Sequence, residues 1–124
     1  MTLTNAPVAV MLPVVDLERA KKFYGEKLGL APMPTSMMGM AMYSAGAGTM
    51  LGLYQREATK ADHTVACFKV PDVVAAVREL KASGVVFEEY NDPDFKTVDS
   101  IVTMGNEKAA WFKDTEGNIL GLGQ

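Results

Sequence analysis

Few side chains in this sequence can carry a proton near neutral pH or donate electrons to a metal ion. The chain has one histidine, His63, and one cysteine, Cys67. His63 is the first candidate for a general acid or base because its ordinary pKa lies near neutrality, and Tyr54 and Cys67 are further candidates. Their spacing shows no set of nucleophile, base and orienting residue. A two-histidine, one-carboxylate iron site cannot form within a chain that has one histidine, and this stock of ligands is poor for structural zinc.

The composition indicates one ordinary soluble domain. The 124 residues are 48% hydrophobic and 22% charged, which is enough to bury a core. The formal net charge is -3 and the Lys and Arg residues are scattered. The sequence therefore predicts no cluster of basic residues that could bind the phosphate backbone of a nucleic acid. The uncharged stretches are short or are broken by Pro and Gly, which argues against a membrane span. We therefore expect a cytoplasmic protein with no nucleic-acid partner and no membrane association.

The first half of the chain predicts a strand, a helix and three further strands. The segment 7–15 is apolar and uncharged, which suits a strand covered on both faces. The next segment, 16–29, has apolar residues at helical spacing, with Asp16 as N-cap and Gly29 as the C-terminal stop. The stretch 33–55 is interrupted by glycines and ends in an apolar run, so we expect three short strands there.

The same order of elements then returns in the second half. A predicted strand over 63–70 is followed by Asp72 and a helix that stops at Gly84. These two residues lie 56 and 55 positions after Asp16 and Gly29 respectively (72 - 16 and 84 - 29). An ordered match of strand, aspartate, helix and glycine predicts an internal structural repeat.

The closing strands of the two halves also match. GTMLGLYQ at 48–55 aligns with GNILGLGQ at 117–124, and the offset there is 69 (117 - 48). The second half therefore holds about a dozen extra residues, which we place in the segment 89–100 because it separates the helix from the final hairpin. The sequence predicts a single domain made of two modules, about 1–58 and 59–124.

Two segments resemble a known protein family. VVDLERAKKFYGEKLGL, residues 14–30, resembles the first strand-helix junction of the vicinal oxygen chelate superfamily, which includes glyoxalase I, extradiol dioxygenases and bleomycin resistance proteins. FKDTEGNILGL, residues 112–122, resembles its closing turn and last strand. The resemblance covers essentially the whole chain. It implies an α+β fold of two βαβββ modules in tandem, with curved mixed sheets that enclose a cavity, often in a homodimer.

The resemblance also bears on metal binding. Metalloenzymes of this superfamily place ligands at four strand positions, which match Ala9, Gly52, Val65 and Gly121 here. None of these side chains can donate to zinc or iron. His63 lies two residues before Val65, so regular strand alternation places both side chains on one sheet face. His63 is therefore the one side chain that could act as a metal ligand close to a matched position. We expect a member that lacks the metal ligands and uses no cofactor, with a metal-dependent lyase or isomerase as an alternative.

Strand alternation predicts what each sheet face carries. If the four matched positions face the cavity, the face toward the helices is uniformly apolar and consists of Val8, Val10, Leu12, Leu51, Leu53, Ala66, Phe68, Leu120 and Leu122. The cavity face combines small, sulfur-containing and aromatic residues, which is typical of a ligand pocket, although methionines that fill the space as core are the alternative. The predicted ligand-binding residues are Met11, Met50, Gly52, Tyr54, His63, Val65, Cys67, Trp111 and Gly121.

Trp111 and the acidic run 87–95, both in the second half of the chain, can each be interpreted in two ways. Trp111 is the only tryptophan, and the turn DTEGN after it does not fix which sheet face it occupies. It is either a pocket wall that stacks on a planar ligand or plain core. The acidic run 87–95 is either a rim that favours cationic ligands or a solvated loop.

These observations favour a binding module that sequesters a small apolar or aromatic molecule without catalysis. The alternative is a cofactor-free enzyme that uses His63 as acid or base, and a glyoxalase-like lyase or isomerase is the activity that the resemblance implies if there is one. Modules that bury a sheet edge against a copy commonly dimerise, so we expect a homodimer.

Overall fold

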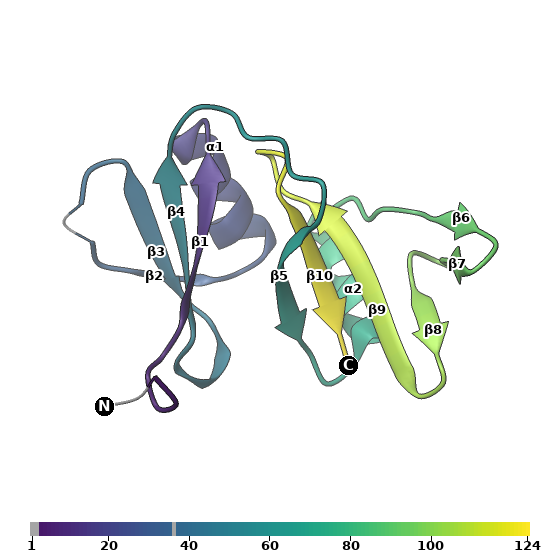
Figure 1. The fold of residues 1–124 in the computed structure, drawn as a ribbon. Coiled ribbons are helices and arrows are strands. Elements are labelled where there is room, and N and C mark those ends of the chain that lie inside the picture. The colour runs from purple at the N-terminus through teal and green to yellow at the C-terminus, as the bar shows by residue number, and fades with distance from the viewer. Residues whose placement is uncertain (1–2, 36) are drawn as a thin grey trace. The chain divides into compact units, whose positions relative to one another are not determined.

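A computed structural model describes residues 3–35 and 37–124. The chain divides into two units, Met1–Thr59 and Lys60–Gln124, which are coloured from purple to teal and from teal to yellow in Figure 1. Each unit holds a four-stranded mixed sheet and one principal helix, so the predicted α+β fold is confirmed. Within the described residues, no helix has the length and apolar character needed to cross a membrane.

The first unit has the predicted order of one strand, one helix and three strands. Its elements are β1 (Ala9–Val14), α1 (Leu17–Lys22), the π-helical turn η1 (Phe23–Lys27), β2 (Ala31–Met33), β3 (Met40–Ser44), the 3-10 turn η2 (Gly46–Gly48) and β4 (Met50–Gln55). The strand order is β1-β4-β3-β2. The first and last strands of the unit, β1 and β4, pair in parallel, and the other pairs are antiparallel.

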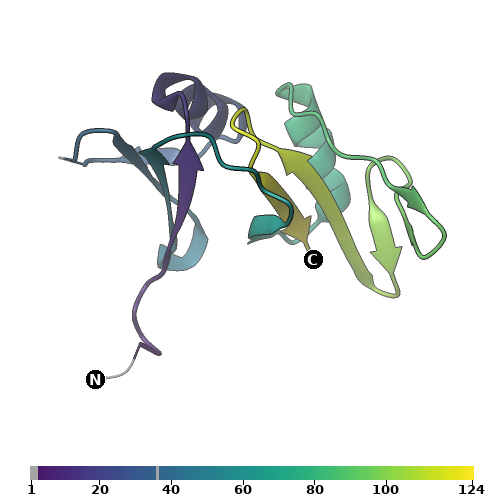
Figure 2. The ribbon, with the colours of Figure 1, turned by 45° about the horizontal axis from the view of Figure 1, so that its top comes forward.

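The second unit repeats this topology with an insertion. Its elements are β5 (Thr64–Lys69), α2 (Val73–Ala82), β6 (Asn91–Asp92), β7 (Phe95–Lys96), β8 (Val102–Met104), β9 (Glu107–Lys113) and β10 (Ile119–Gly123). The order β5-β10-β9-β8 matches the first unit, and β5 is again parallel to β10. The short hairpin β6–β7 forms a separate two-stranded sheet between α2 and β8, and Figures 1 and 2 show it on the β8 side of the unit.

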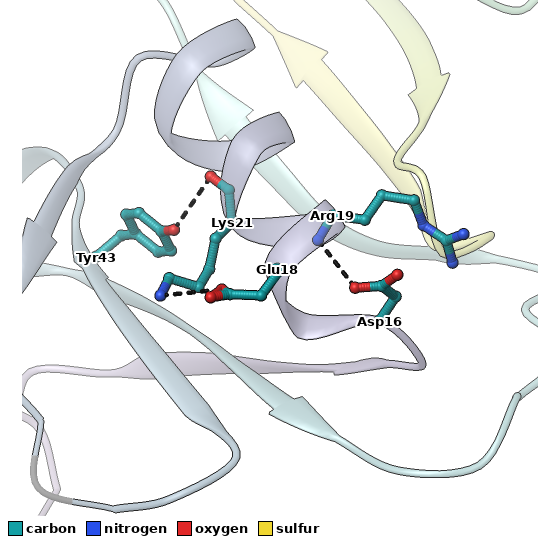
Figure 3. Close-up of polar contacts among 5 residues, drawn as sticks. All are labelled: Asp16, Glu18, Arg19, Lys21 and Tyr43. Carbon is teal, nitrogen blue, oxygen red and sulfur yellow. Dashed lines mark hydrogen bonds and ion pairs between the residues drawn. The ribbon is translucent and has the colours of Figure 1, made fainter.

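The helix boundaries follow the predicted caps. The Asp16 side chain accepts a hydrogen bond from the Arg19 backbone N–H at 3.0 Å (Figure 3), and Asp72 does the same for Ala75 at 3.1 Å. Gly29 and Gly84 both have positive φ, at 73° and 98°, where a side chain is unfavourable.

The first helix departs from the regular helix expected over 16–29. Its last turn is wider, because the Leu28 N–H donates to the Phe23 carbonyl, five residues back, at 3.0 Å. Phe23 and Tyr24 are both buried in this turn, with ring centroids 5.3 Å apart. The helix is also fixed to β3, where the Tyr43 hydroxyl donates to the Lys21 carbonyl at 3.4 Å (Figure 3).

The core of each unit lies between its helix and one sheet face. Leu12, Leu51, Leu53, Leu120 and Leu122 are all buried, as predicted for the helix-covered face. Val10, Ala66 and Phe68, predicted for the same face, are half-buried. Val8 departs from that prediction, because it precedes β1, which begins at Ala9, and is 64% exposed. The facing helical residues include Ala20 and Tyr24 in the first unit and Val73 and Val77 in the second, all buried.

The turn between β9 and β10 is held by one buried carboxylate. Asp114 Oδ1 accepts from the backbone N–H groups of Glu116 and Asn118, and Oδ2 accepts from Asn118 Nδ2, each at 2.8 Å. Asp114 and Asn118 are both buried. In the first unit, the corresponding turn closes through a bond from Ala45 N–H to the Thr49 carbonyl at 2.9 Å, with alanine in place of the aspartate.

We predict that Asp114→Ala destabilises the protein by about 2 kcal/mol, because three hydrogen bonds to a buried carboxylate are lost together. Urea denaturation followed by circular dichroism measures this change. Glu57→Ala, at an exposed position, is the control and leaves the midpoint unchanged. Equal midpoints for the two variants would show that the carboxylate does not hold the turn.

Candidate functional site

The sheet face that lies away from the helix is organised around one glycine in each unit. In the first unit, Gly52 of β4 pairs with Met11 of β1 on one side and with Met42 of β3 on the other. A Cβ atom built on Gly52 would lie 2.6 Å from Met11 Sδ and 2.8 Å from Met42 Sδ. The two thioethers therefore fold over the glycine and occupy the space that a side chain would take.

Gly121 of β10 has the equivalent position in the second unit. It pairs with Cys67 of β5 and Trp111 of β9. A Cβ atom on Gly121 would lie 3.2 Å from Trp111 Nε1 and 3.5 Å from Cys67 Sγ. Trp111 is thus on the helix-free face, while the next residue, Phe112, is buried on the other face. The sequence left these two orientations open, and the register decides between them.

Trp111 belongs to a cluster of three aromatic rings, which we name the aromatic wall: Tyr90, Phe95 and Trp111. Its ring centroids are 5.2 Å apart for Tyr90 and Phe95, 5.9 Å for Tyr90 and Trp111, and 5.3 Å for Phe95 and Trp111. All three side chains are half-buried. Tyr90 and Phe95 come from the inserted segment, which the sequence predicted only as a rim or a solvated loop, so both were missed as site residues.

The inserted segment is fixed in place by Glu89. Its carboxylate accepts hydrogen bonds from the Ser100 N–H at 3.1 Å, from the Ser100 hydroxyl, and from the Thr97 hydroxyl at 2.7 Å. These donors, with the Ser100 hydroxyl first, hold the pKa of Glu89 below its usual range. Asp99 and Ser100 have φ of 51° and 73°, a left-handed conformation that costs energy in non-glycine residues. We name these contacts the Glu89 latch.

The latch connects directly to the aromatic wall. The backbone N–H of Tyr90 donates to the Thr97 hydroxyl oxygen at 2.9 Å, and the Thr97 N–H donates to the Tyr90 carbonyl at 2.9 Å. Glu88 attaches the segment to β9, since its N–H donates to the Trp111 carbonyl at 2.8 Å and its carboxylate lies 3.4 Å from Lys113 Nζ. Burial, with a contribution from the negative charge of Glu88, raises the pKa of Tyr90.

His63 lies outside the strands. It precedes β5, its side chain is 72% exposed, and its Nδ1 is 2.7 Å from Asp62 Oδ1. The hydrogen bond to His63 lowers the pKa of Asp62. Ile119 pairs with Thr64 while Leu120 pairs with Ala66, so a β-bulge falls at Val65. Regular alternation, the basis for placing His63 on the face of Val65, therefore does not hold at this point.

The remaining predicted residues, Met50 and Tyr54, lie beside Gly52. In the first unit, Met50 and Tyr54 are two residues before and after Gly52 on β4, which places all three on one face.

Among residues 3–35 and 37–124, no group of three or more His, Cys, Asp and Glu side chains is arranged to hold a metal ion. The four positions matched to family ligands hold Ala, Gly, Val and Gly, which do not fit zinc or iron.

Comparisons with known proteins place this geometry in context. The structure is similar to that of a glyoxalase/bleomycin resistance protein from Streptomyces sp. CB03234, with 25% identity, a TM-score of 0.71, and coverage of 96% of this chain and 100% of that one. It is similar to TnmS3, an antibiotic binding protein from the same organism, with 24% identity, a TM-score of 0.71, and coverage of 100% and 98%. A lactoylglutathione lyase from Agrobacterium tumefaciens has 20% identity, a TM-score of 0.71, and coverage of 96% and 92%.

A binding protein and a lyase thus share this fold to the same degree, so the fold alone does not decide the function. A search of curated protein sequences gives no match. Residues 7–122 match the sequence profile of one family, and this span includes both central glycines and all but the last residue of the four-stranded sheets. The chain belongs to the Glyoxalase/Bleomycin resistance protein/Dioxygenase superfamily.

Proposed function

We propose that this protein binds a small apolar or aromatic molecule without a metal ion and without catalysis. The observation that carries the proposal is the aromatic wall beside Gly121 on the helix-free face of the second unit. Three rings in edge-to-face and tilted contact leave part of the indole accessible while fixing its orientation. Such a surface gives a planar ligand a large apolar contact area, and each aromatic pair adds about 0.5–1.5 kcal/mol beyond the area buried.

The surroundings of the wall support binding more than reaction. Gly121 keeps the adjacent backbone free of a side chain, and its nearest neighbours are the indole and the Cys67 thiol. The hydrogen bonds that hold the wall are made by Glu89, Thr97 and Ser100 on the inserted segment. These contacts order the wall before a ligand arrives, which lowers the entropy cost of binding. The similarity to an antibiotic binding protein supports the same class of function.

The proposed ligand-binding set keeps the residues predicted from the sequence and adds two. The set is Met11, Met50, Gly52, Tyr54, His63, Val65, Cys67, Trp111 and Gly121, with Tyr90 and Phe95 as additions from the inserted segment. The proposal also includes a cytoplasmic location and a homodimer. Both four-stranded sheets end in edge strands, β1 and β2 in one and β5 and β8 in the other, and an identical chain can cover such edges.

A thermal-shift screen tests the binding function. We expect planar aromatic compounds, supplied at about 100 times their Kd, to stabilise the protein by about 2.7 kcal/mol, and aliphatic compounds of the same size to have little effect. Trp111→Leu is expected to remove most of the gain for the aromatic compounds. Glu57→Ala, at an exposed position outside the proposed set, is the control and is expected to keep the gain.

Two outcomes would contradict the proposal. One is the absence of stabilisation by every aromatic compound. The other is turnover of a bound compound that disappears in His63→Ala while its affinity is kept, which would establish the cofactor-free enzyme instead.

The Glu89 latch gives a second prediction. Glu89→Gln keeps one oxygen, which can still accept from the Ser100 N–H and the Thr97 hydroxyl. It replaces the other oxygen, which accepts from the Ser100 hydroxyl, by an amide NH₂ that cannot accept. We expect Tyr90 and Phe95 to move away from Trp111, so that the tryptophan emission shifts to the red. The stability loss is about 1 kcal/mol, because the carboxylate is exposed. Glu79→Gln, on the exposed side of α2, leaves the emission unchanged, and an unchanged spectrum in Glu89→Gln would refute the latch.

The pH dependence of the same signal isolates the carboxylate. Because the folded pKa of Glu89 is lowered, its contribution to stability is complete above the usual glutamate pKa and is lost as pH falls through the folded value. The tryptophan emission of the native protein should therefore shift to the red as the pH falls below the usual range of glutamate. This transition should be missing from Glu89→Gln. Identical titration curves for the two proteins would assign the transition to other groups.

A further inference from the structure

The first unit presents an observation that is independent of the aromatic wall. Met11, Gly52, Met42 and Met33 are register partners across the four strands β1, β4, β3 and β2. Register partners share one sheet face, so three methionines lie in a single row with a glycine between two of them. We name Met11, Met42 and Met33 the methionine row.

The geometry brings two sulfur atoms of this row together. A single point, the Cβ position of Gly52, lies 2.6 Å from Met11 Sδ and 2.8 Å from Met42 Sδ. The two sulfurs therefore converge on the space above the glycine, and any larger residue at position 52 would push them apart. Met11 is 42% exposed and Met42 is half-buried, so solvent reaches the row at Met11 while the thioethers themselves cover the glycine. Met33, the register partner of Met42, is half-buried beside it.

The chemistry of these atoms selects one class of ligand. A thioether sulfur is soft, polarisable and uncharged, and it binds Cu(I) in preference to hard ions such as Mg²⁺ or Ca²⁺. Neutral ligands also favour a monovalent ion, because nothing in the row offsets the larger desolvation cost of a divalent one. We infer that the methionine row is a binding site for a soft monovalent cation, Cu(I) or Ag(I). The sulfur lone pairs form the bonds, and no proton is released.

Titration with Ag(I) tests the site. The experiment uses Cys67→Ser protein in chloride-free buffer, because the exposed Cys67 thiol would bind the same ion. We expect saturable binding of one ion by calorimetry. In a protein labelled at the methionine methyl carbons, the signals of Met11 and Met42 should shift while that of Met38, which is 97% exposed, stays in place. The affinity should not change between about pH 5 and pH 8, where a histidine site would titrate.

Matched variants separate the site from general sulfur binding. Met42→Leu preserves side-chain volume and is expected to fold. Its affinity for Ag(I) should fall by about tenfold or more, because removing even an outer-shell partner of a metal ligand costs that much. Met38→Leu should bind as the Cys67→Ser parent does. Binding that does not saturate, equal shifts at Met38 and Met11, or equal affinity in a folded Met42→Leu protein would overturn the inference. The titration contains no aromatic compound, so the inference and the proposed binding function can fail separately, although Met11 belongs to both sets of residues.

Discussion

Parallel pairing of the first and last strands of each unit is the constraint on which the rest of the structure depends. β1 lies beside β4 and β5 lies beside β10, although a principal helix and two strands separate the first pair in sequence, and a helix and four strands separate the second. The pairing brings the beginning and the end of each unit into one sheet and gives the helix a single apolar face to cover. It also fixes the register in which Gly52 lies opposite Met11 and Gly121 lies opposite Cys67. The helix-free face of each unit follows from that register.

The two units use the same backbone arrangement for different surface chemistry. Around Gly52 the neighbours are thioethers, which are flexible and soft. Around Gly121 they are an indole and a thiol, and the indole is held by two further rings. In both units the central glycine has no side chain that could oppose its neighbours, so the residues on the flanking strands determine the character of the face. Divergence of these flanking residues is enough to give one repeated fold two unlike surfaces.

Much of the fold was predictable because it depends on local signals. Asp16 and Asp72 cap their helices, Gly29 and Gly84 end them with positive φ, and the closing strands repeat the same letters. The site was less predictable because it depends on contacts between distant residues. The face of Trp111 follows from its pairing with Gly121, and the bulge at Val65 follows from a register shift that the strand pattern does not show. Tyr90 and Phe95 were missed, since nothing local links them to a tryptophan that follows 21 and 16 residues later respectively (111 - 90 and 111 - 95).

The inserted hairpin has a consequence for how such a protein can diversify. It supplies two of the three rings beside Trp111, yet it forms a small sheet of its own and contributes no strand to the four-stranded sheet. Its length and composition can therefore drift with little effect on the strands and helix that fold the second unit. The segment that supplies Tyr90 and Phe95 is thus separable from the strands that fold the second unit, while Trp111 belongs to one of those strands. Exchanging this one segment among related scaffolds is a direct way to vary the rings packed against Trp111 while the framework is kept intact.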